Sequence, residues 1–174
     1  MRQSHTAQVI DTERLELLPL QVEHAEEMAG VLADPALHAF IGGEPDDVGA
    51  LRARYERLVE GSPDPAVSWL NWVIRLRDEG SLTGYVQASV AVSGDADPVA
   101  EVAWVVGTAW QGRGIASEAV RGLVDWLRTQ SVSAVIAHVH PDHRASAAVA
   151  TAGGLSPTDE REDGEVRWRR VFDR

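Results

Sequence analysis

The stretch WQGRGIASEAV, residues 110–120, places Gly112 and Gly114 directly before a helix-like segment that starts near Ile115. A nearly continuous apolar run at residues 99–106 precedes it and indicates a central strand. The first N–H groups of a helix lack partners inside the helix, and the helix dipole adds partial positive charge there. Glycines at such a turn let the backbone approach phosphate oxygens that a Cβ atom would keep away. The stretch therefore predicts a cradle for a phosphate or pyrophosphate group.

The apolar spacing on either side predicts one mixed α/β domain over residues 11–174, preceded by a flexible N-terminus over residues 1–10. Strands are expected at residues 13–18, 69–76, 82–92, 99–106, 134–139 and 165–171. Helices are expected at residues 21–33, 48–60, 115–130 and 144–151, and a loop is expected at 41–47. The order is a meander of strands followed by a strand–helix–strand crossover.

The composition narrows the class of protein. The chain has 174 residues and a formal net charge of −11, and all 16 of its basic residues are arginine. A nucleic-acid partner is not expected, because a phosphate-binding face needs clustered basic residues. The absence of cysteine excludes disulfides and thiolate metal sites. No apolar run approaches the roughly 18 residues of a membrane span, so we expect a cytoplasmic protein without a membrane partner.

Two common phosphate-binding motifs fit the glycine stretch poorly. GRGIAS places Gly112, Gly114 and Ser117 at the spacing of a dinucleotide fingerprint. That fingerprint belongs to the first strand–helix unit of its fold, whereas several strands come first here. A nucleoside-triphosphate P-loop requires a lysine, and the chain contains none.

A third motif fits better. Gln111-x-x-Gly114-x-Ala116, placed after an apolar strand and at the start of the strongest helix, resembles the coenzyme A loop of the GNAT acetyltransferase superfamily. PDHRAS at residues 141–146, followed by GGL at 153–155, resembles the Pro-x-Asn-x-x-Ser … Gly-Phe segment of one branch of that superfamily. This branch includes the ribosomal-protein N-terminal acetyltransferases.

Two further features bear on the comparison with that branch. AEVAWVV before the loop and Glu118 after it are similar to the same branch. The chain departs from the pattern at His143, where the branch has an asparagine beside the pantetheine arm of the coenzyme. Leu155 in place of the phenylalanine is a conservative change.

The resemblance implies a single-domain α+β fold whose mixed, mostly antiparallel sheet is flanked by helices and has splayed central strands. It implies an N-acetyltransferase that moves an acetyl group from its cosubstrate acetyl-CoA to a primary amine, on a protein N-terminus or on a small molecule. The runner-up is a non-catalytic acyl-CoA-binding sensor or interaction module. A homodimer is also compatible with the sequence. We expect no metal site, because HVHPDH at residues 138–143 lacks a clear fourth ligand.

The resemblance also implies the coenzyme-binding residues. The backbone at Trp104, Val105 and Val106 is expected to pair with the pantetheine arm and to polarise the thioester carbonyl, as oriented N–H donors do. His143 is expected beside that arm. The loop residues expected to bind the coenzyme are Gln111, Gly112, Arg113, Gly114, Ile115 and Ala116.

Five residues are candidates for catalysis. Ser146 matches the family position that protonates the leaving thiolate, and Tyr85 is a competing donor. Glu101 lies in an apolar run, where a buried carboxylate is costly unless it is used or paired, so it is a candidate general base. His140 and His143 are further candidates for that base, because imidazole titrates near neutral pH. Loops at residues 40–48 and 76–82 are expected to build the acceptor pocket.

Overall fold

The computed structural model describes residues 5–173, apart from the side chains of Phe40 and Ile41. The described residues form an eight-stranded sheet in the order β1-β2-β3-β4-β5-β6-β8-β7. Its strands are β1 (Ile10–Asp11), β2 (Leu15–Pro19), β3 (Val67–Leu76), β4 (Ser81–Ala91), β5 (Val99–Val106), β6 (Ala134–Val139), β7 (Ser156–Glu162) and β8 (Glu165–Val171). Every neighbouring pair is antiparallel except β5 and β6, which are parallel. The predicted α+β fold with a mixed, mostly antiparallel sheet is confirmed.

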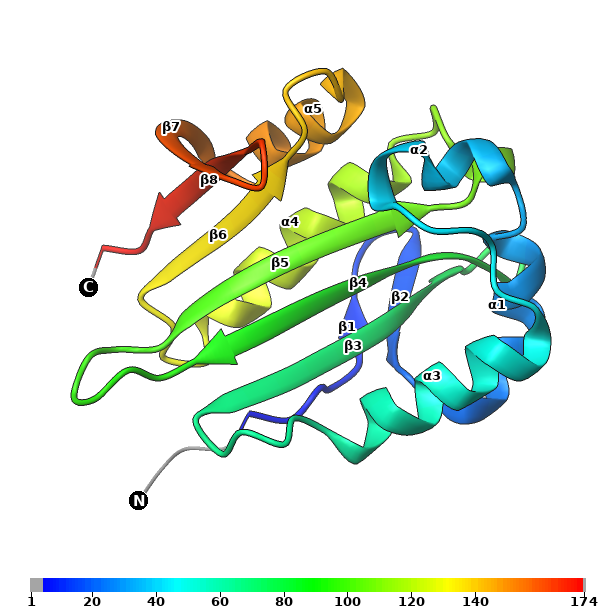
Figure 1. Cartoon of the computed structure of the whole chain (residues 1–174), viewed down its shortest axis with the longest axis horizontal. Coiled ribbons are helices and arrows are strands. Elements are labelled where there is room, and N and C mark those ends of the chain that lie inside the picture. The colour runs from blue at the N-terminus through cyan, green and yellow to red at the C-terminus, as the bar shows by residue number, and fades with distance from the viewer. Residues whose placement is uncertain (1–4, 174) are drawn as a thin grey trace.

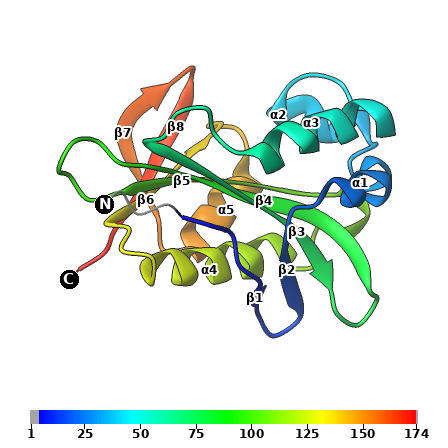
Figure 2. The ribbon, with the colours of Figure 1, turned by 90° about the horizontal axis from the view of Figure 1, so that it is seen from below.

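Helices cover both faces of this sheet (Figure 1 and Figure 2). The helices are α1 (Ala25–Val31), α2 (His38–Ile41), α3 (Val48–Glu60), α4 (Ile115–Arg128) and α5 (Arg144–Ala152). The first three lie on one face, and α4 lies on the other with α5 beside it. Buried residues of α4 recur at helical spacing, from Ile115 to Leu127, so one side of the helix packs into the larger core. A smaller core joins α1 and α3 to the opposite face of β3 and β4.

The predicted boundaries agree with the structure where the local pattern is strong. Residues 48–60, 99–106, 134–139 and 165–171 form α3, β5, β6 and β8 as expected. The helix expected at residues 21–33 is instead a 3-10 turn (Val22–His24) followed by α1. Strand β7 was not expected, because its sequence SPTDERE shows no apolar alternation and the strand lies exposed at the sheet edge.

The N-terminal segment makes contacts that its composition did not indicate. Residues 1–4 of the predicted flexible terminus lie outside the described residues. His5 is only 8% exposed, and its Nε2 lies 3.0 Å from the carbonyl oxygen of Gln130. Trp72 Nε1 donates to the carbonyl of Gln8 at 2.7 Å, and Ile10 belongs to the larger core. The chain therefore packs on the body of the domain from His5 onward.

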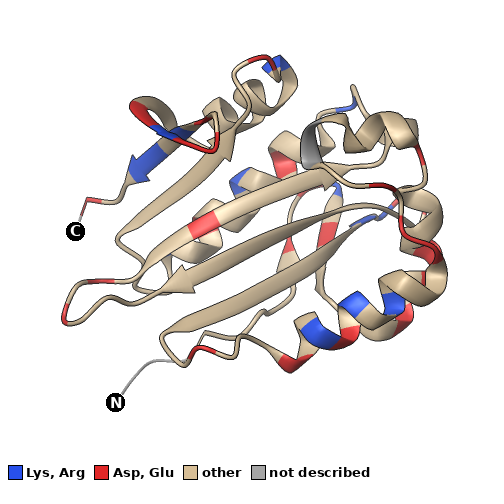
Figure 3. Ribbon diagram, viewed as in Figure 1, with Lys and Arg blue, Asp and Glu red and all other residues tan. Residues whose placement is uncertain are grey.

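Charge is distributed unevenly over the elements (Figure 3). Strand β4 carries no charged residue, and β5 carries only Glu101. Most acidic residues lie on helices, turns and loops instead. Among the helices that the structure describes, none combines the length and the apolar character needed to cross a membrane.

Candidate active site

The two central strands separate where the site begins. Strand β5 pairs with β6 over three residues only, Val99 to Glu101, although both strands continue beyond that point. Figure 1 shows β5 and β6 diverging toward their carboxyl ends, with α5 beginning close to the open end of the split. Since no described residue of β6 pairs with β5 beyond Glu101, the β6-facing edge of Trp104, Val105 and Val106 has no strand partner. The predicted splaying of the central strands is confirmed.

The loop before α4 has the geometry that its glycines predicted. Gly112 and Gly114 have φ angles of 79° and 76°, in the left-handed region that glycine adopts without strain. Gly114 is the N-cap of α4, so the first N–H groups of that helix have no intrahelical partners. An added Cβ on Gly112 would meet no atom within 4 Å, so the space in front of this residue is open. The loop is therefore free to approach an anionic group.

A groove of about 500 Å³ runs from this loop to the split between the strands. We call it the coenzyme groove. Its lining includes five of the predicted loop residues, Gln111, Gly112, Gly114, Ile115 and Ala116, and also Ser117 in the first turn of α4. Ala36 and Leu37, from the segment before α2, form its opposite wall and were not predicted.

Two of the predicted loop side chains have other partners. Gln111 Nε2 donates to the carbonyl of Val106 at 3.0 Å, which ties the loop to the end of β5. Arg113 Nη2 pairs with Glu79 Oε1 at 3.2 Å on the β3–β4 hairpin, and Arg113 does not line the groove. The groove is therefore lined at the loop by backbone and small side chains rather than by this arginine.

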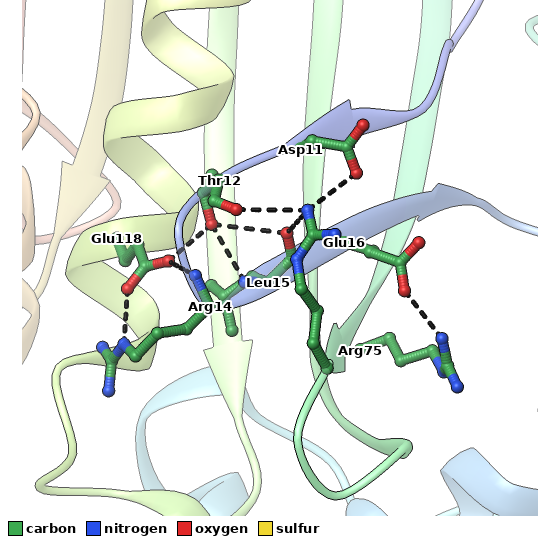
Figure 4. A network of polar contacts seen from close by, with 8 residues as sticks. Asp11, Thr12, Arg14, Leu15, Glu16, Arg75 and Glu118 are labelled. Atoms are coloured by element: carbon green, nitrogen blue, oxygen red, sulfur yellow. Dashed lines mark hydrogen bonds and ion pairs between the residues drawn. The ribbon is translucent and has the colours of Figure 1, made fainter.

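A buried network behind the loop was missed by the sequence analysis (Figure 4). Glu118 Oε1 accepts from Arg14 Nε at 2.7 Å, and Oε2 accepts from the Arg14 backbone N at 2.8 Å and from Thr12 Oγ1 at 2.5 Å. Arg14 Nη1 donates to the carbonyl of Arg113 at 2.9 Å. No spacing in the sequence links Glu118 to Thr12 or Arg14, which lie more than 100 residues earlier in the chain.

The same network sets the charge of Glu118. Burial, the largest single influence, favours the neutral acid, but the hydrogen bonds from Thr12 and from Arg14 together outweigh it and lower the pKa of Glu118. The carboxylate is therefore ionised at neutral pH and is able to anchor the arginine.

A second cavity, of about 460 Å³, lies on the open sheet face next to the groove. We call it the acceptor cavity. It is lined by β4, β5, the end of β6 and the turn between β7 and β8, including Gln87, Glu101, His138, His140, Asp163 and Glu165. No residue described for the predicted acceptor loops, 40–48 and 76–82, lines it.

The coenzyme groove and the acceptor cavity meet at four shared residues: Trp104, Val105, His143 and Ser146. Trp104 and Val105 come from the end of β5, and the other two come from the start of α5. The Ser146 side chain is half-buried and has no hydrogen-bond partner among residues 5–173. Its hydroxyl does not cap the helix and is therefore available at the junction.

The expectation that Glu101 is buried is wrong. Its side chain is 49% exposed, and Oε1 lies 2.5 Å from Nδ1 of His138. The physical reason is the split: because β5 and β6 diverge and no helix covers this part of the sheet, the face of β5 that carries Glu101 opens into the acceptor cavity. The register of β5 on β4 is regular, so Glu101 shares this face with Ala103 and Val105, as a regular strand predicts.

The histidine near Glu101 is engaged on both nitrogens. His138 Nε2 lies 3.0 Å from Glu162 Oε2 and accepts from Arg167 Nε at 3.2 Å. Glu101, His138 and Glu162 place one ligand atom each within 4.8 Å of one another, a spacing that a metal ion also uses. The positive charge of the adjacent Arg167 guanidinium repels a metal ion at this position.

The other two histidines of HVHPDH, His140 and His143, lie at the turn before α5. His140 Nδ1 accepts from the backbone N of Asp142 at 3.1 Å, so this ring helps to form the turn. His143 is the N-cap residue of α5 and lines both cavities. Burial, and then the nearby charge of His140, lower the pKa of His143 below its usual 6.5. His143 is therefore neutral at neutral pH.

Comparison with known proteins agrees with this geometry. A family model described as the acetyltransferase (GNAT) domain matches residues 14–156. No curated protein sequence matches the chain.

Solved structures with the same fold include several acetyltransferases. RimL, a ribosomal L7/L12 alpha-N-protein acetyltransferase in complex with coenzyme A, has a TM-score of 0.75 at 17% identity, over 95% of this chain and 99% of that one. An acetyltransferase from Agrobacterium tumefaciens has a TM-score of 0.71 at 26% identity, over 99% of both chains. AAC(6')-Ib, in complex with paromomycin and acetyl-CoA, has a TM-score of 0.73 at 19% identity, over 91% of this chain and 94% of that one. With the family model matching most of its length, this chain belongs to the GNAT acetyltransferase family and is an acetyl-CoA-dependent acetyltransferase.

Proposed function

We propose that the protein transfers the acetyl group of acetyl-CoA to a primary amine at the junction of the two cavities. The single observation that carries this proposal is the sharing of Trp104, Val105, His143 and Ser146 by the coenzyme groove and the acceptor cavity. A thioester lying in the first cavity and an amine lying in the second meet only where the cavities meet. Holding two reactants at such a junction removes most of the entropic cost of bringing them together.

The coenzyme groove suits the pyrophosphate and pantetheine parts of the cosubstrate. The open backbone at Gly112 and Gly114 and the N-terminus of α4 provide N–H donors and a partial positive charge for phosphate oxygens. The edge of β5 at Trp104–Val106 has no strand partner and, apart from the Val106 carbonyl that Gln111 occupies, provides main-chain donors and acceptors for the amide groups of the pantetheine arm.

The chemistry assigned to the junction is direct transfer. The neutral amine nitrogen attacks the thioester carbonyl, so that an N–C bond forms while the carbonyl electron pair moves to oxygen. The main-chain N–H groups at the end of β5 stabilise that oxygen. Collapse of the adduct breaks the C–S bond, the thiolate takes a proton from Ser146 Oγ, which regains one from solvent water, and the nitrogen loses its extra proton to a base.

His143 is the base that the geometry favours. It lies on both cavities, and its lowered pKa makes the neutral imidazole the main form at neutral pH. Glu101 lies in the acceptor cavity but not in the coenzyme groove, and His138 already occupies its Oε1. Glu101 therefore stays the second candidate for this role.

The proposed acceptor is a primary amine on a protein N-terminus or on a small molecule. RimL is described as an alpha-N-protein acetyltransferase, and AAC(6')-Ib was solved with paromomycin, so the fold serves acceptors of both kinds. The open face of the acceptor cavity places no wall across the end of β5 that would exclude either kind.

Two measurements test the function. Acetyl-CoA at about 100 times its Kd should stabilise the protein by roughly 2.7 kcal/mol in thermal unfolding. Gly112→Val should abolish this shift, because its side chain occupies the space of the phosphate. Gly94→Val is the matched control, since Gly94 also has a positive φ, 59°, and open space around it, but lies outside the coenzyme groove. Equal shifts in both variants would refute the phosphate loop.

Catalysis is tested separately from binding. Mass spectrometry of an amine panel incubated with the protein and acetyl-CoA should show products heavier by one acetyl group. Binding of acetyl-CoA without any acetylated product, across peptides and small amines, would favour the non-catalytic acyl-CoA-binding alternative.

A further inference from the structure

A third cavity lies between α3 and the face of β3 and β4 that α4 does not cover. We call it the side pocket; it has a volume of about 90 Å³ and is lined by Leu51, Tyr55, Leu58, Asn71, Tyr85 and Gln87 among others. Tyr85 and Gln87 also line the acceptor cavity. Tyr85 is the direct cross-strand neighbour of Val105, one of the junction residues. The side pocket therefore lies next to the place where the acetyl transfer is proposed.

Two tyrosine hydroxyls in the side pocket lack partners. Tyr55 is only 4% exposed, yet its hydroxyl makes no hydrogen bond to any residue that the structure describes. Within the described chain, every side-chain N or O atom that is sealed from solvent has a partner. The Tyr55 hydroxyl must therefore open into the pocket. The hydroxyl of Tyr85, on a half-buried side chain, is likewise without a described partner.

Both hydroxyls are neutral. Burial is the main cause that raises the pKa of Tyr55 and of Tyr85 above the usual 10, so neither ionises near neutral pH. A neutral phenol both donates and accepts a hydrogen bond. Neither hydroxyl is committed to a hydrogen bond with a described residue, so both are available to bind a polar group that enters the pocket.

The remaining lining limits the charge and size of that group. Arg54 and Asp46, the lining residues with fixed charges, pair with each other at 3.0 Å. The other lining residues are leucines and uncharged polar or aromatic side chains together with His38, so a charged group would lose water and gain no fixed opposite charge. The volume is smaller than the roughly 150 Å³ of an engineered cavity that holds benzene.

Resting on the proposed function, we propose that the side pocket selects the acceptor. It holds a small, neutral, hydroxyl- or amide-bearing substituent close to the reacting amine, and Tyr55 is the specificity-determining residue that recognises it. Tyr85, which lines the pocket, lies one strand away from Val105, about 5 Å in a sheet. We therefore expect the substituent and the reacting amine to belong to one small unit of the acceptor, as a side chain and an α-amine do.

Amino acid amides test this inference, because they share one α-amine and differ only in the side chain. We expect serinamide and threoninamide to exceed alaninamide in kcat/KM by about tenfold, the contribution of one well-placed hydrogen bond. Phenylalaninamide, which is too large, and lysinamide, which is charged, should fall below alaninamide. Tyr55→Phe should remove the preference for serinamide over alaninamide while leaving the rate with alaninamide and the Kd for acetyl-CoA unchanged.

Thr83→Val is the matched control. It also removes a buried hydroxyl, two residues from Tyr85, but that hydroxyl is satisfied by the carbonyl of Ile74 and lies outside the side pocket. The control should keep the preference for serinamide even if it lowers stability.

Several outcomes would overturn the inference. One is a Tyr55→Phe enzyme that slows serinamide and alaninamide equally, and another is a wild-type enzyme that turns over the amides without regard to side chain. Failure to acetylate any amide, in a protein that still binds acetyl-CoA and acetylates other amines, also refutes the inference but leaves the proposed function standing. A protein that does not bind acetyl-CoA at all would refute the proposed function itself.

Discussion

Arg14 joins the first turn of α4 to the loop that precedes it. Its Nε donates to Glu118 at 2.7 Å (Figure 4), while its Nη1 donates to the main-chain carbonyl of Arg113 at 2.9 Å. Arg14 lies in the turn between β1 and β2, and Glu118, in α4, is 104 residues further along the chain. A single guanidinium thus holds both sides of Gly114, the N-cap of the helix.

Arg14→Gln should weaken coenzyme binding. Without the guanidinium the carbonyl of Arg113 is released and the loop loses its fixed position, so the Kd for coenzyme A should rise about tenfold, roughly the loss of one charge-assisted hydrogen bond. Isothermal titration calorimetry measures this change. Arg77→Gln is the control, because Arg77 donates to Asp11, Thr12 and Leu15 on the β1–β2 turn without touching the loop. Equal losses in the two variants would mean that only the stability of that turn matters.

The carboxylate of Glu118 should make stability depend on pH. Its pKa in the folded protein lies below the ordinary 4.5, so the folded state favours the ionised form more than the unfolded chain does. The stabilisation is therefore fully present above pH 4.5 and is lost as the pH falls through the folded pKa. Urea unfolding should show wild type more stable than Glu118→Gln at neutral pH, with the difference shrinking below pH 4.5. A difference that stays constant would show that the carboxylate contributes nothing through its charge.

Ser146→Ala should slow the chemical step. The hydroxyl at the junction is proposed to protonate the thiolate, an interaction present only as the C–S bond breaks, so kcat should fall on the order of 100-fold. The Kd for acetyl-CoA should be unchanged. Ser117→Ala is the matched control, since Ser117 lines the coenzyme groove but not the junction. If kcat survives in Ser146→Ala, the donor is a different group, and Tyr85→Phe is the next variant to measure.

The pH profile of kcat/KM should identify the base. The pKa of His143 lies below 6.5, so a neutral His143 base keeps the enzyme active at neutral pH, and activity falls only as the pH drops below 6.5. His143→Gln should lower the rate and abolish this acidic limb. His140→Gln should keep the limb, because the ring of His140 is engaged in the turn before α5. An acidic limb that persists in His143→Gln and vanishes in Glu101→Gln would assign the base to Glu101.

The sequence alone was sufficient for the elements whose signals are local. The apolar run of β5, the helical spacing of α4 and the glycines between them depend on neighbours within a few residues, and the structure has them where they were expected. The family motif lies in the same continuous segment, so its resemblance to the coenzyme A loop was also readable. Ser146 and His143 could be named as candidate site residues because their motif spans only a few residues at the start of α5.

Only the tertiary structure decided which distant residues meet. The pairing of Arg14 with Glu118 and the exposure of Glu101 depend on how β2, α4 and the split between β5 and β6 are arranged, and no spacing along the chain encodes those distances. The helical spacing of Tyr55 predicts a core residue. Tyr55 also lines a pocket, because α3 packs against β4. Periodicity specifies which face of an element is buried, because that depends on local backbone geometry. The chemistry of a cavity depends instead on side chains brought together from several elements by long-range packing, and that packing is set by the whole chain at once.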